Sequence, residues 1–241
     1  MFSKAKSKKK QLKMLASQLI TVQDPQSIVS EQFKTIRTNI NFSMSDKHIS
    51  TLLITSSTPS EGKSTNSANI AAVFAQAEKK VLLIDSDMRK PTAHHTFAVE
   101  NTMGLSDLLI RQHTIEEVLQ KTTIEGLDII TSGPIPPNPT ELLSSEAMDQ
   151  LIEILNDKYD LVIFDAPSVL SVTDAQILSN KCEGVILVVN TGKTEKDNVV
   201  KAKNILLASK ANMLGVIMNN FILRKDLNYY KYYNNSENRI N

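Results

Sequence analysis

Short apolar runs alternate with amphipathic stretches along most of the chain. Six runs are nearly continuous in Leu, Ile and Val, at residues 51–57, 81–87, 127–133, 159–167, 184–192 and 214–220. Runs of this length and composition are typical of strands that are buried on both faces. Their alternation with helical patterns predicts an α/β fold with a doubly wound, mostly parallel sheet flanked by helices. Ligands bind such sheets beyond the carboxyl ends of the strands, so the polar residues after each run are candidate site residues.

Helical periodicity is clear in three segments, at residues 28–44, 64–79 and 141–156. The proline-rich stretch at 133–139 leads into the third segment, which Thr140 is expected to cap. The predicted apolar faces consist, in chain order, of Val29, Phe33, Ile36, Ile40 and Met44, then Ile70, Val73, Phe74 and Ala77, then Met148, Leu151, Ile152 and Leu155.

The composition fits one large α/β domain or two small ones. The chain has 241 residues, 41% of them hydrophobic, and a formal net charge of +1. One domain of this length buries a substantial core without covalent cross-links. The near-neutral charge argues against a nucleic-acid partner, which would need a broad basic face. The single cysteine, Cys182, excludes an internal disulfide framework and is expected to be a packed side chain.

Both ends differ from the middle of the chain. Residues 1–25 are predicted to be a flexible basic arm, whose first 13 residues carry six lysines and no acid. Such an arm is either simply solvated or attracted to an anionic membrane face. The central domain is predicted over 26–223, and it begins with a helix at 26–45. No run is long enough to span a bilayer or to resemble a signal peptide, so a cytoplasmic protein is expected.

The last residues, 224–241, are polar, rich in asparagine and predicted to form a flexible tail. They are also where the chain concentrates its tyrosines. Of five tyrosines, four lie in this tail: Tyr229, Tyr230, Tyr232 and Tyr233.

A phosphate-binding loop follows the first apolar run. The stretch "SSTPSEGKST" matches G-x-x-x-x-G-K-[ST], except that Ser57 stands at the first glycine position. A small residue suffices there if the backbone does not need a positive φ. Because the loop joins a strand to a helix, its N–H groups and the helix N-terminus are expected to hold phosphate oxygens. Lys63 would neutralise the β- and γ-phosphates, and the Ser64 hydroxyl would bind Mg²⁺. The predicted nucleotide-binding residues are Ser60, Glu61, Gly62, Lys63, Ser64, Thr65 and, near the base, Asn219.

Acidic residues end two of the apolar runs. Asp85 and Asp87 end the second run, and Asp165 ends the fourth. A carboxylate at a strand end beside a phosphate loop is suited to holding the metal ion, although a strand-end turn or helix cap is the alternative. Arg89 and Lys90 follow at once and place positive charge near the same rim. The neighbouring histidines at 94 and 95 lack partners at metal spacing and are expected to be structural or exposed.

Taken together, these motifs resemble the bacterial tyrosine kinases of capsule and exopolysaccharide synthesis. The resemblance is to the split Gram-positive form, in which a cytoplasmic kinase works with a separate membrane activator. It runs from about residue 26 to the tail and depends on "SEQFKTIRTNI", "TSSTPSEGKST", "VLLIDSDMRKP", "TSGPIPPNPTELL", "VIFDAP", "VTDAQIL" and "YYKYY". It implies a P-loop NTPase fold with Walker A, A′ and B motifs at Lys63–Ser64, at Asp85 and Asp87, and at Asp165.

The resemblance also implies the chemistry. An ATP- and Mg²⁺-dependent protein-tyrosine kinase would phosphorylate the four tail tyrosines in trans. Lys63 would be catalytic, and either Asp85 or Asp87 would accept the phenolic proton, a choice that the residues leave open. Ser64, Asp85 and Asp165 would hold the metal ion.

Several partners are implied as well. The family forms a ring of eight protomers through a Glu-x-x-Arg-x-x-Arg motif, which here reads Glu31, Lys34 and Arg37. Lysine keeps the charge of the first arginine but not its planar, forked set of donors. Further implied partners are a transmembrane activator, which would recruit the kinase to the inner face of the membrane, protein-tyrosine substrates and a phosphotyrosine phosphatase.

Two alternatives share the predicted fold. A related family of division-site and DNA-partitioning ATPases carries a lysine near the start of the loop. Here that stretch reads Thr58, Pro59, Ser60 and Glu61, which departs from the ATPases and agrees with the kinases. The second alternative is a catalytically idle, nucleotide-binding adaptor.

Overall fold

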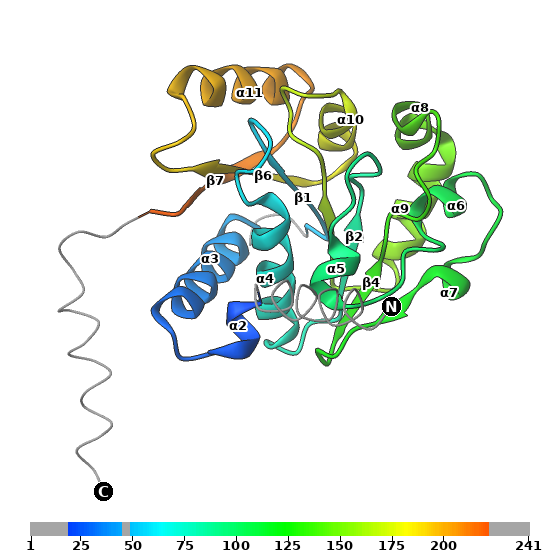
Figure 1. Cartoon of the computed structure of the whole chain (residues 1–241), viewed down its shortest axis with the longest axis horizontal. Helices are drawn as coiled ribbons and strands as arrows, with labels where there is room; N and C mark the ends of the chain where they lie inside the picture. Colours follow the sequence, from blue (N-terminus) through cyan, green and yellow to red (C-terminus); the bar gives the residue numbers. More distant parts are fainter. Residues whose placement is uncertain (1–18, 45–48, 222–241) are drawn as a thin grey trace, which may run out of the picture.

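A seven-stranded sheet lies at the centre of the protein, with helices on both of its faces (Figure 1). The structure is a computed structural model that describes residues 19–44 and 49–221. The strand order is β3-β4-β2-β5-β1-β6-β7, and every pairing is parallel except β3 with β4. This architecture confirms the predicted fold class. The strands are β1 (Thr51–Ser56), β2 (Val81–Asp85), β3 (Gln120–Lys121), β4 (Leu127–Ile130), β5 (Leu161–Asp165), β6 (Gly184–Asn190) and β7 (Met213–Asn219).

Alternate residues of the central strands enter two separate cores, one on each face of the sheet. In β5, Val162 and Phe164 belong to the first core, whereas Leu161 and Ile163 belong to the second. Successive side chains of a strand point to opposite faces, which is why a continuous apolar run suits a strand covered on both sides.

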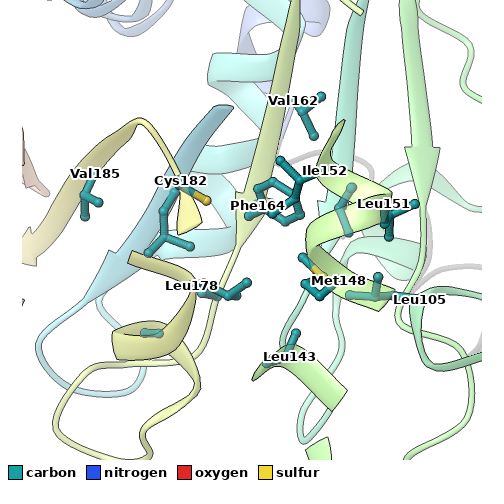
Figure 2. Packing of buried hydrophobic residues seen from close by; sticks show 14 of the residues in the cluster. Leu105, Leu143, Met148, Leu151, Ile152, Val162, Phe164, Leu178, Cys182 and Val185 are labelled. Atoms are coloured by element: carbon teal, nitrogen blue, oxygen red, sulfur yellow. The ribbon is translucent and has the colours of Figure 1, made fainter. Parts of the chain in front are cut away.

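Each core is closed by its own set of helices. In the first core, Met148, Leu151 and Ile152 pack over Phe164 (Figure 2). Its helices are α6 (Leu105–Leu109), α7 (Ile115–Val118), α8 (Pro139–Ser144), α9 (Glu146–Asn156), α10 (Asp174–Lys181) and α11 (Lys196–Ala208). The second core lies under α2 (Ile20–Gln23), α3 (Ile28–Met44), α4 (Lys63–Ala75) and α5 (Ala93–Phe97).

Two of the three predicted helices are shorter than expected. The segment predicted at 64–79 is α4, which ends at Ala75, so Ala77 lies beyond it and is exposed. The segment predicted at 141–156 is divided at Ser145, whose extended backbone separates α8 from α9. The Ser145 hydroxyl accepts a bond from the Met148 amide at 3.4 Å, so it caps α9.

The prediction that Thr140 caps a helix is wrong. Thr140 lies inside α8, whose N-cap residue is Asn138. Its hydroxyl donates instead to the Asp174 carboxylate at 2.8 Å. The Thr140 hydroxyl therefore bonds to a side chain that is distant in sequence, and it does not cap the helix as the local pattern predicts.

The edge strands depart most from the sequence pattern. The expectation that every run is buried on both faces is wrong for β7, where Val216 is 52% and Met218 57% exposed. This strand lies at the end of the sheet and pairs only with β6 among the described strands. At the opposite edge, β3 is two residues long, too short to produce a recognisable sequence period.

The predicted helix at 28–44 is α3, with Phe33 and Ile40 buried, although Val29 is exposed. Ahead of it, α2 packs against α4, and the buried Thr21 hydroxyl donates to Asn69 Oδ1 at 2.9 Å. The packed part of the chain thus begins before the predicted boundary at residue 26. The rest of the predicted arm and the whole predicted tail lie outside the described residues. Within the described ranges, no helix is long and apolar enough to cross a bilayer. Cys182 is buried, as expected for a packing side chain.

Candidate active site

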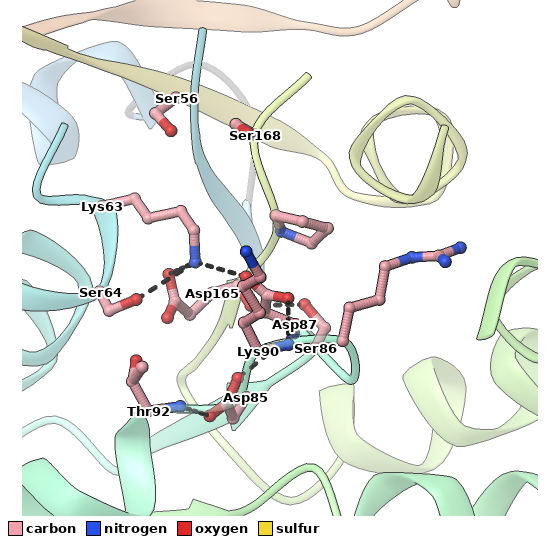
Figure 3. A network of polar contacts seen from close by, with 12 residues as sticks. Ser56, Lys63, Ser64, Asp85, Ser86, Asp87, Lys90, Thr92, Asp165 and Ser168 are labelled. Carbon is pink, nitrogen blue, oxygen red and sulfur yellow. Dashed lines mark hydrogen bonds and ion pairs between the residues drawn. The ribbon is translucent and has the colours of Figure 1, made fainter. Parts of the chain in front are cut away.

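The site lies at the carboxyl edge of the sheet, where three segments distant in sequence meet (Figure 3). β5 lies between β1 and β2, and Asp85 and Asp165 are direct partners in the register of β2 and β5. A cleft of about 590 Å³ opens beside them. It is lined by Pro59, Ser60, Gly62, Lys63, Ser64, Thr65, Asp87, Arg89, Lys90, Thr92, His95, Thr96, Pro167, Ser168, Ser171 and Val172.

The backbone of the predicted phosphate loop requires glycine at one position. Gly62 has a φ of 90°, and a Cβ atom there would lie 2.1 Å from Asn219 Nδ2. Helix α4 begins at the next residue, and its first three residues line the cleft. Ser57 is not among the residues with positive φ, which explains why serine is tolerated at the first glycine position. The loop therefore has the form needed to hold phosphate oxygens.

Glu61 braces this loop from inside. Glu61 is 2% exposed, and its carboxylate accepts bonds from the Ser57 amide at 2.9 Å and the Thr58 hydroxyl at 2.8 Å. The Thr194 hydroxyl, beyond β6, donates to the same carboxylate. Any contact of Glu61 with a nucleotide would therefore come from its backbone. The sequence contained no local signal for Thr194, because 133 residues separate the two partners.

Asn219, expected near a nucleotide base, contacts the loop itself. Its Nδ2 group donates to the Glu61 carbonyl at 2.9 Å. It is also the side chain that excludes any Cβ at Gly62. Asn219 and Thr194 thus tie the ends of β7 and β6 to the phosphate loop, and a role of Asn219 toward a base stays a prediction.

Lys63 is the charge centre of the site. Its Nζ atom lies 3.0 Å from Asp87 Oδ2 and 3.8 Å from Asp165 Oδ1, and it donates to Ser64 Oγ at 3.2 Å (Figure 3). Burial alone would lower the pKa of Lys63, but the charges of Asp165 and Asp87 outweigh it and raise the pKa. The ammonium group is therefore retained at the mouth of the loop.

Asp165 has one oxygen that no described group satisfies. Its Oδ1 atom accepts a bond from Ser67 Oγ at 3.1 Å, while Oδ2 is buried and has no partner among the described residues. Burial raises the pKa of this carboxyl group, opposed chiefly by the charge of Lys63. A buried carboxylate oxygen without a partner is costly, and a bound cation or its water would satisfy it.

The residues present fit Mg²⁺ of the kind that keeps most of its water. Among the described residues, no group of three or more His, Cys, Asp or Glu side chains is arranged to hold a metal ion. Mg²⁺ is commonly held by one or two protein oxygens together with phosphates and water. The Ser64 hydroxyl and the unsatisfied Asp165 oxygen are the groups suited to this role.

The two acidic residues after β2 have different surroundings. Asp85 is fully buried, and its Oδ2 atom accepts bonds from the amides of Thr92 and Ala93, both at 2.9 Å. Asp87 lines the cleft and contacts Lys63. Asp85 therefore holds the backbone of the following turn, whereas Asp87 faces the space where a substrate would bind.

We expect the stability of the nucleotide-free protein to depend on the ionisation of Asp85. Burial and the neighbouring Asp165 raise the pKa of Asp85 from 3.8 to about 7. Since the folded state holds this proton more tightly, the stabilising contribution is complete below about pH 4 and is lost as the pH rises toward about 7. Relative to Asp85→Asn, the wild type should lose unfolding free energy on the order of a few kcal/mol across this range in urea titrations. A difference that stays constant with pH would contradict the expectation.

The ring-motif residues make contacts within the protomer. Lys34 Nζ lies 2.6 Å from Glu31 Oε1 and donates to the Pro25 carbonyl at 3.2 Å. Arg37 donates through Nη1 to the Val73 carbonyl at 2.7 Å, near the end of α4. In one protomer, then, Arg37 joins α3 to the P-loop helix.

Comparison with known proteins decides between the families that share this fold. The AAA domain family matches residues 49–194. The tyrosine-protein kinase YwqD of Bacillus subtilis is 50% identical over 220 residues, which cover 91% of this chain and 92% of that protein. The chain belongs to the bacterial tyrosine kinases. Membership of this family confirms the resemblance drawn from the motifs.

Solved structures agree with the assignment. The kinase domain of the Escherichia coli tyrosine kinase ETK has a TM-score of 0.83 and 37% identity, covering 86% of this chain and 81% of that one. The chimerical protein CapA2B2 has a TM-score of 0.82 and 45% identity, covering 85% of this chain and 90% of that one. The likeness therefore extends from the motifs to the backbone of the whole domain, consistent with membership of the bacterial tyrosine kinase family.

Proposed function

We propose that this protein is an ATP- and Mg²⁺-dependent protein-tyrosine kinase that phosphorylates its own C-terminal tyrosines in trans and regulates capsular or exopolysaccharide synthesis and export. The observation that carries the proposal is the position of Lys63. Its ammonium group lies at the head of a phosphate loop, in contact with Asp87 and close to Asp165. This combination supports transfer of a phosphoryl group at the cleft, because such transfer requires mainly positioning and charge neutralisation.

On this proposal the chain's own groups bind and orient the nucleotide. The amides of residues 60–65 and the N-terminus of α4 hold phosphate oxygens, and Lys63 offsets negative charge on the terminal phosphate. Mg²⁺, held by Ser64 and, through water, by Asp165, would supply further charge neutralisation when bound. Glu61 keeps the loop in shape through its bonds to Ser57 and Thr58.

Asp87 is the proposed acceptor of the phenolic proton. It lines the cleft next to Lys63, whereas both oxygens of Asp85 accept bonds from backbone amides. A tyrosine hydroxyl has a pKa of about 10, so a nearby carboxylate assists by taking the proton as the oxygen bonds to phosphorus. As the tyrosine oxygen bonds to the terminal phosphorus, the bond between that phosphorus and the bridging oxygen of the nucleotide breaks, and the nucleoside diphosphate leaves.

The proposed acceptors are Tyr229, Tyr230, Tyr232 and Tyr233, which lie outside the described residues. A tail near a neighbouring cleft raises the effective concentration of tyrosine. Each phosphate adds about −1.5 to −2 charge, so four would place about −6 to −8 on one tail. Repulsion between such tails would loosen an assembly of protomers, which couples phosphorylation to the proposed regulation.

The proposed partners follow the family pattern. They are other copies of the chain in a ring of eight, a transmembrane activator, protein-tyrosine substrates and a phosphotyrosine phosphatase. Glu31 is exposed on α3 and available to a neighbour, while Lys34 provides charge without the forked geometry of arginine. The basic first 13 residues support recruitment to an anionic membrane face.

Mass spectrometry after incubation with Mg-ATP tests the proposal directly. We expect phosphotyrosine in the peptide after Arg224 when the intact protein is mixed with the cytoplasmic fragment of its activator. A version truncated after Arg224 should show none, and chelation of Mg²⁺ should abolish labelling of the intact protein. Rapid ATP turnover without phosphotyrosine would instead identify a positioning ATPase. Equal labelling with and without the fragment would contradict only the proposed dependence on an activator, and the kinase activity itself would stand.

A further inference from the structure

Arg89 is held by two residues from distant parts of the chain. Its Nε atom donates to Asp174 Oδ2 at 2.8 Å, and its Nη2 atom donates to Asp174 Oδ1 at 3.1 Å and to Thr140 Oγ1 at 2.9 Å. Thr140 in turn donates to Asp174 Oδ1 at 2.8 Å. The three residues belong to the turn after β2, to α8 and to the first position of α10. They form a closed set of bonds, which we call the Arg89 clamp.

The clamp uses only one edge of the guanidinium group. The hydrogen bonds of Arg89 to described residues use Nε and Nη2, and none uses Nη1. The side chain is 38% exposed and lines the same cleft as Lys63 and Asp87. Because the guanidinium is planar and rigid, fixing Nε and Nη2 also fixes the direction of Nη1.

Stability alone is a weak explanation for this arrangement. The Asp174 side chain is 0% exposed, so its charge has been taken out of water. The free energy lost by removing an ion pair from water is often as large as the attraction between the two charges. Proteins in which apolar residues of similar size replace such a pair are often equally stable. A bidentate pair between arginine and a carboxylate also adds geometric specificity, because it fixes the orientation of the guanidinium group.

We infer that Asp174 and Thr140 are positioning residues that hold Arg89 so that its Nη1 edge binds a phosphate group in the cleft. The inference rests on the proposed kinase function. Two groups share the required chemistry: the terminal phosphate of the nucleotide and the phosphate of a phosphotyrosine. Arginine suits either, because its fork matches phosphate oxygens.

Four variants test the clamp: Thr140→Val, Asp174→Asn, Arg89→Lys and the conservative Thr140→Ser. Phosphorylation of the C-terminal peptide should fall about 10-fold in kcat for Thr140→Val and about 100-fold for Asp174→Asn, because small displacements of a positioned group have effects of this size. Thr140→Ser keeps the hydroxyl and should behave as the wild type. Arg89→Lys keeps the charge but loses the fork, so it should match Asp174→Asn.

Binding measurements on the full-length protein distinguish the two phosphates. Affinities are measured for ADP, for a non-hydrolysable ATP analogue and for a phosphotyrosine peptide. If Arg89 binds the terminal phosphate of the nucleotide, the clamp variants lose affinity for the analogue and keep that for ADP. If Arg89 binds phosphotyrosine, the clamp variants lose affinity for the phosphotyrosine peptide and keep their affinity for ADP and for the analogue. Either pattern supports the inference, since a purely structural contact would change neither ratio.

Two results would overturn the positioning role. One is a lowered melting temperature with wild-type kcat and all three affinities unchanged. The other is an equal loss of ADP and analogue affinity, which would indicate general distortion of the cleft. A wild-type protein that makes no phosphotyrosine would refute the proposed function instead, while the analogue-to-ADP affinity ratio would still decide what the clamp does.

Discussion

The Lys63→Met variant is expected to lose about 10³-fold in the rate of tail tyrosine phosphorylation. Methionine keeps much of the length of lysine but removes the cation that lies 3.0 Å from Asp87 and 3.8 Å from Asp165. The lysine charge no longer offsets the developing charge on the terminal phosphate, and the carboxylates of Asp87 and Asp165 lose the cation that lies between them. Quantitative mass spectrometry of the peptide after Arg224 measures the loss.

Lys79→Met is the matched control. Lys79 is 55% exposed and its ion pair with Asp160 lies at 3.8 Å, outside the residues that line the cleft. The same chemical change at this position should leave phosphorylation unchanged. Melting temperatures of both variants show whether the loss in Lys63→Met reflects unfolding. Wild-type labelling in a folded Lys63→Met protein would remove the basis for the proposed mechanism.

The Asp87→Asn variant is expected to lose about 10²- to 10⁴-fold in kcat while its nucleotide affinity changes little. In the wild type, the Lys90 amide donates to Asp87 Oδ1 at 3.0 Å. Asparagine keeps the shape of the side chain and an oxygen that can accept this bond. It has no basicity with which to accept the phenolic proton. Single-turnover phosphorylation and equilibrium binding of ADP separate the two effects.

Asp157→Asn provides the control for this change, because Asp157 is exposed at the end of α9 and away from the cleft. Its kinetics should equal those of the wild type. The Asp85→Asn variant is the comparison arm, and its main effect should be on the pH dependence of stability. If Asp87→Asn transfers phosphate at the wild-type rate, a group other than Asp87 must accept the phenolic proton.

Much of this site could be predicted because its residues follow a local pattern. Lys63 and Ser64 lie in the loop that follows the first apolar run, and the aspartates at 85, 87 and 165 lie at the ends of two other runs. Parallel strands end at the same edge of a sheet. The structure brings all of them together, as the pattern predicts. Their chemical types then indicate phosphate and Mg²⁺ without any further information.

The predictions failed where a partner lies far away in sequence. Threonine before a helical pattern is often a cap, so the sequence predicts that Thr140 caps a helix. In the structure its hydroxyl donates a hydrogen bond to Asp174 instead. The helix predicted at 64–79 ends early because the chain turns at residues 76–80 toward β2. The pattern of β7 resembles that of central strands, but its position at the edge leaves part of it exposed.

The sequence by itself determined the parallel α/β architecture, the phosphate loop and the acidic strand ends, because each depends on residues that are neighbours along the chain. Only the tertiary structure decided how these groups differ from one another. It buries Asp85 under backbone amides and places Asp87 in the cleft, and it joins Thr194 to Glu61 and Asp174 to Arg89. Burial and long-range hydrogen bonds depend on which elements pack together, and no local period encodes that packing.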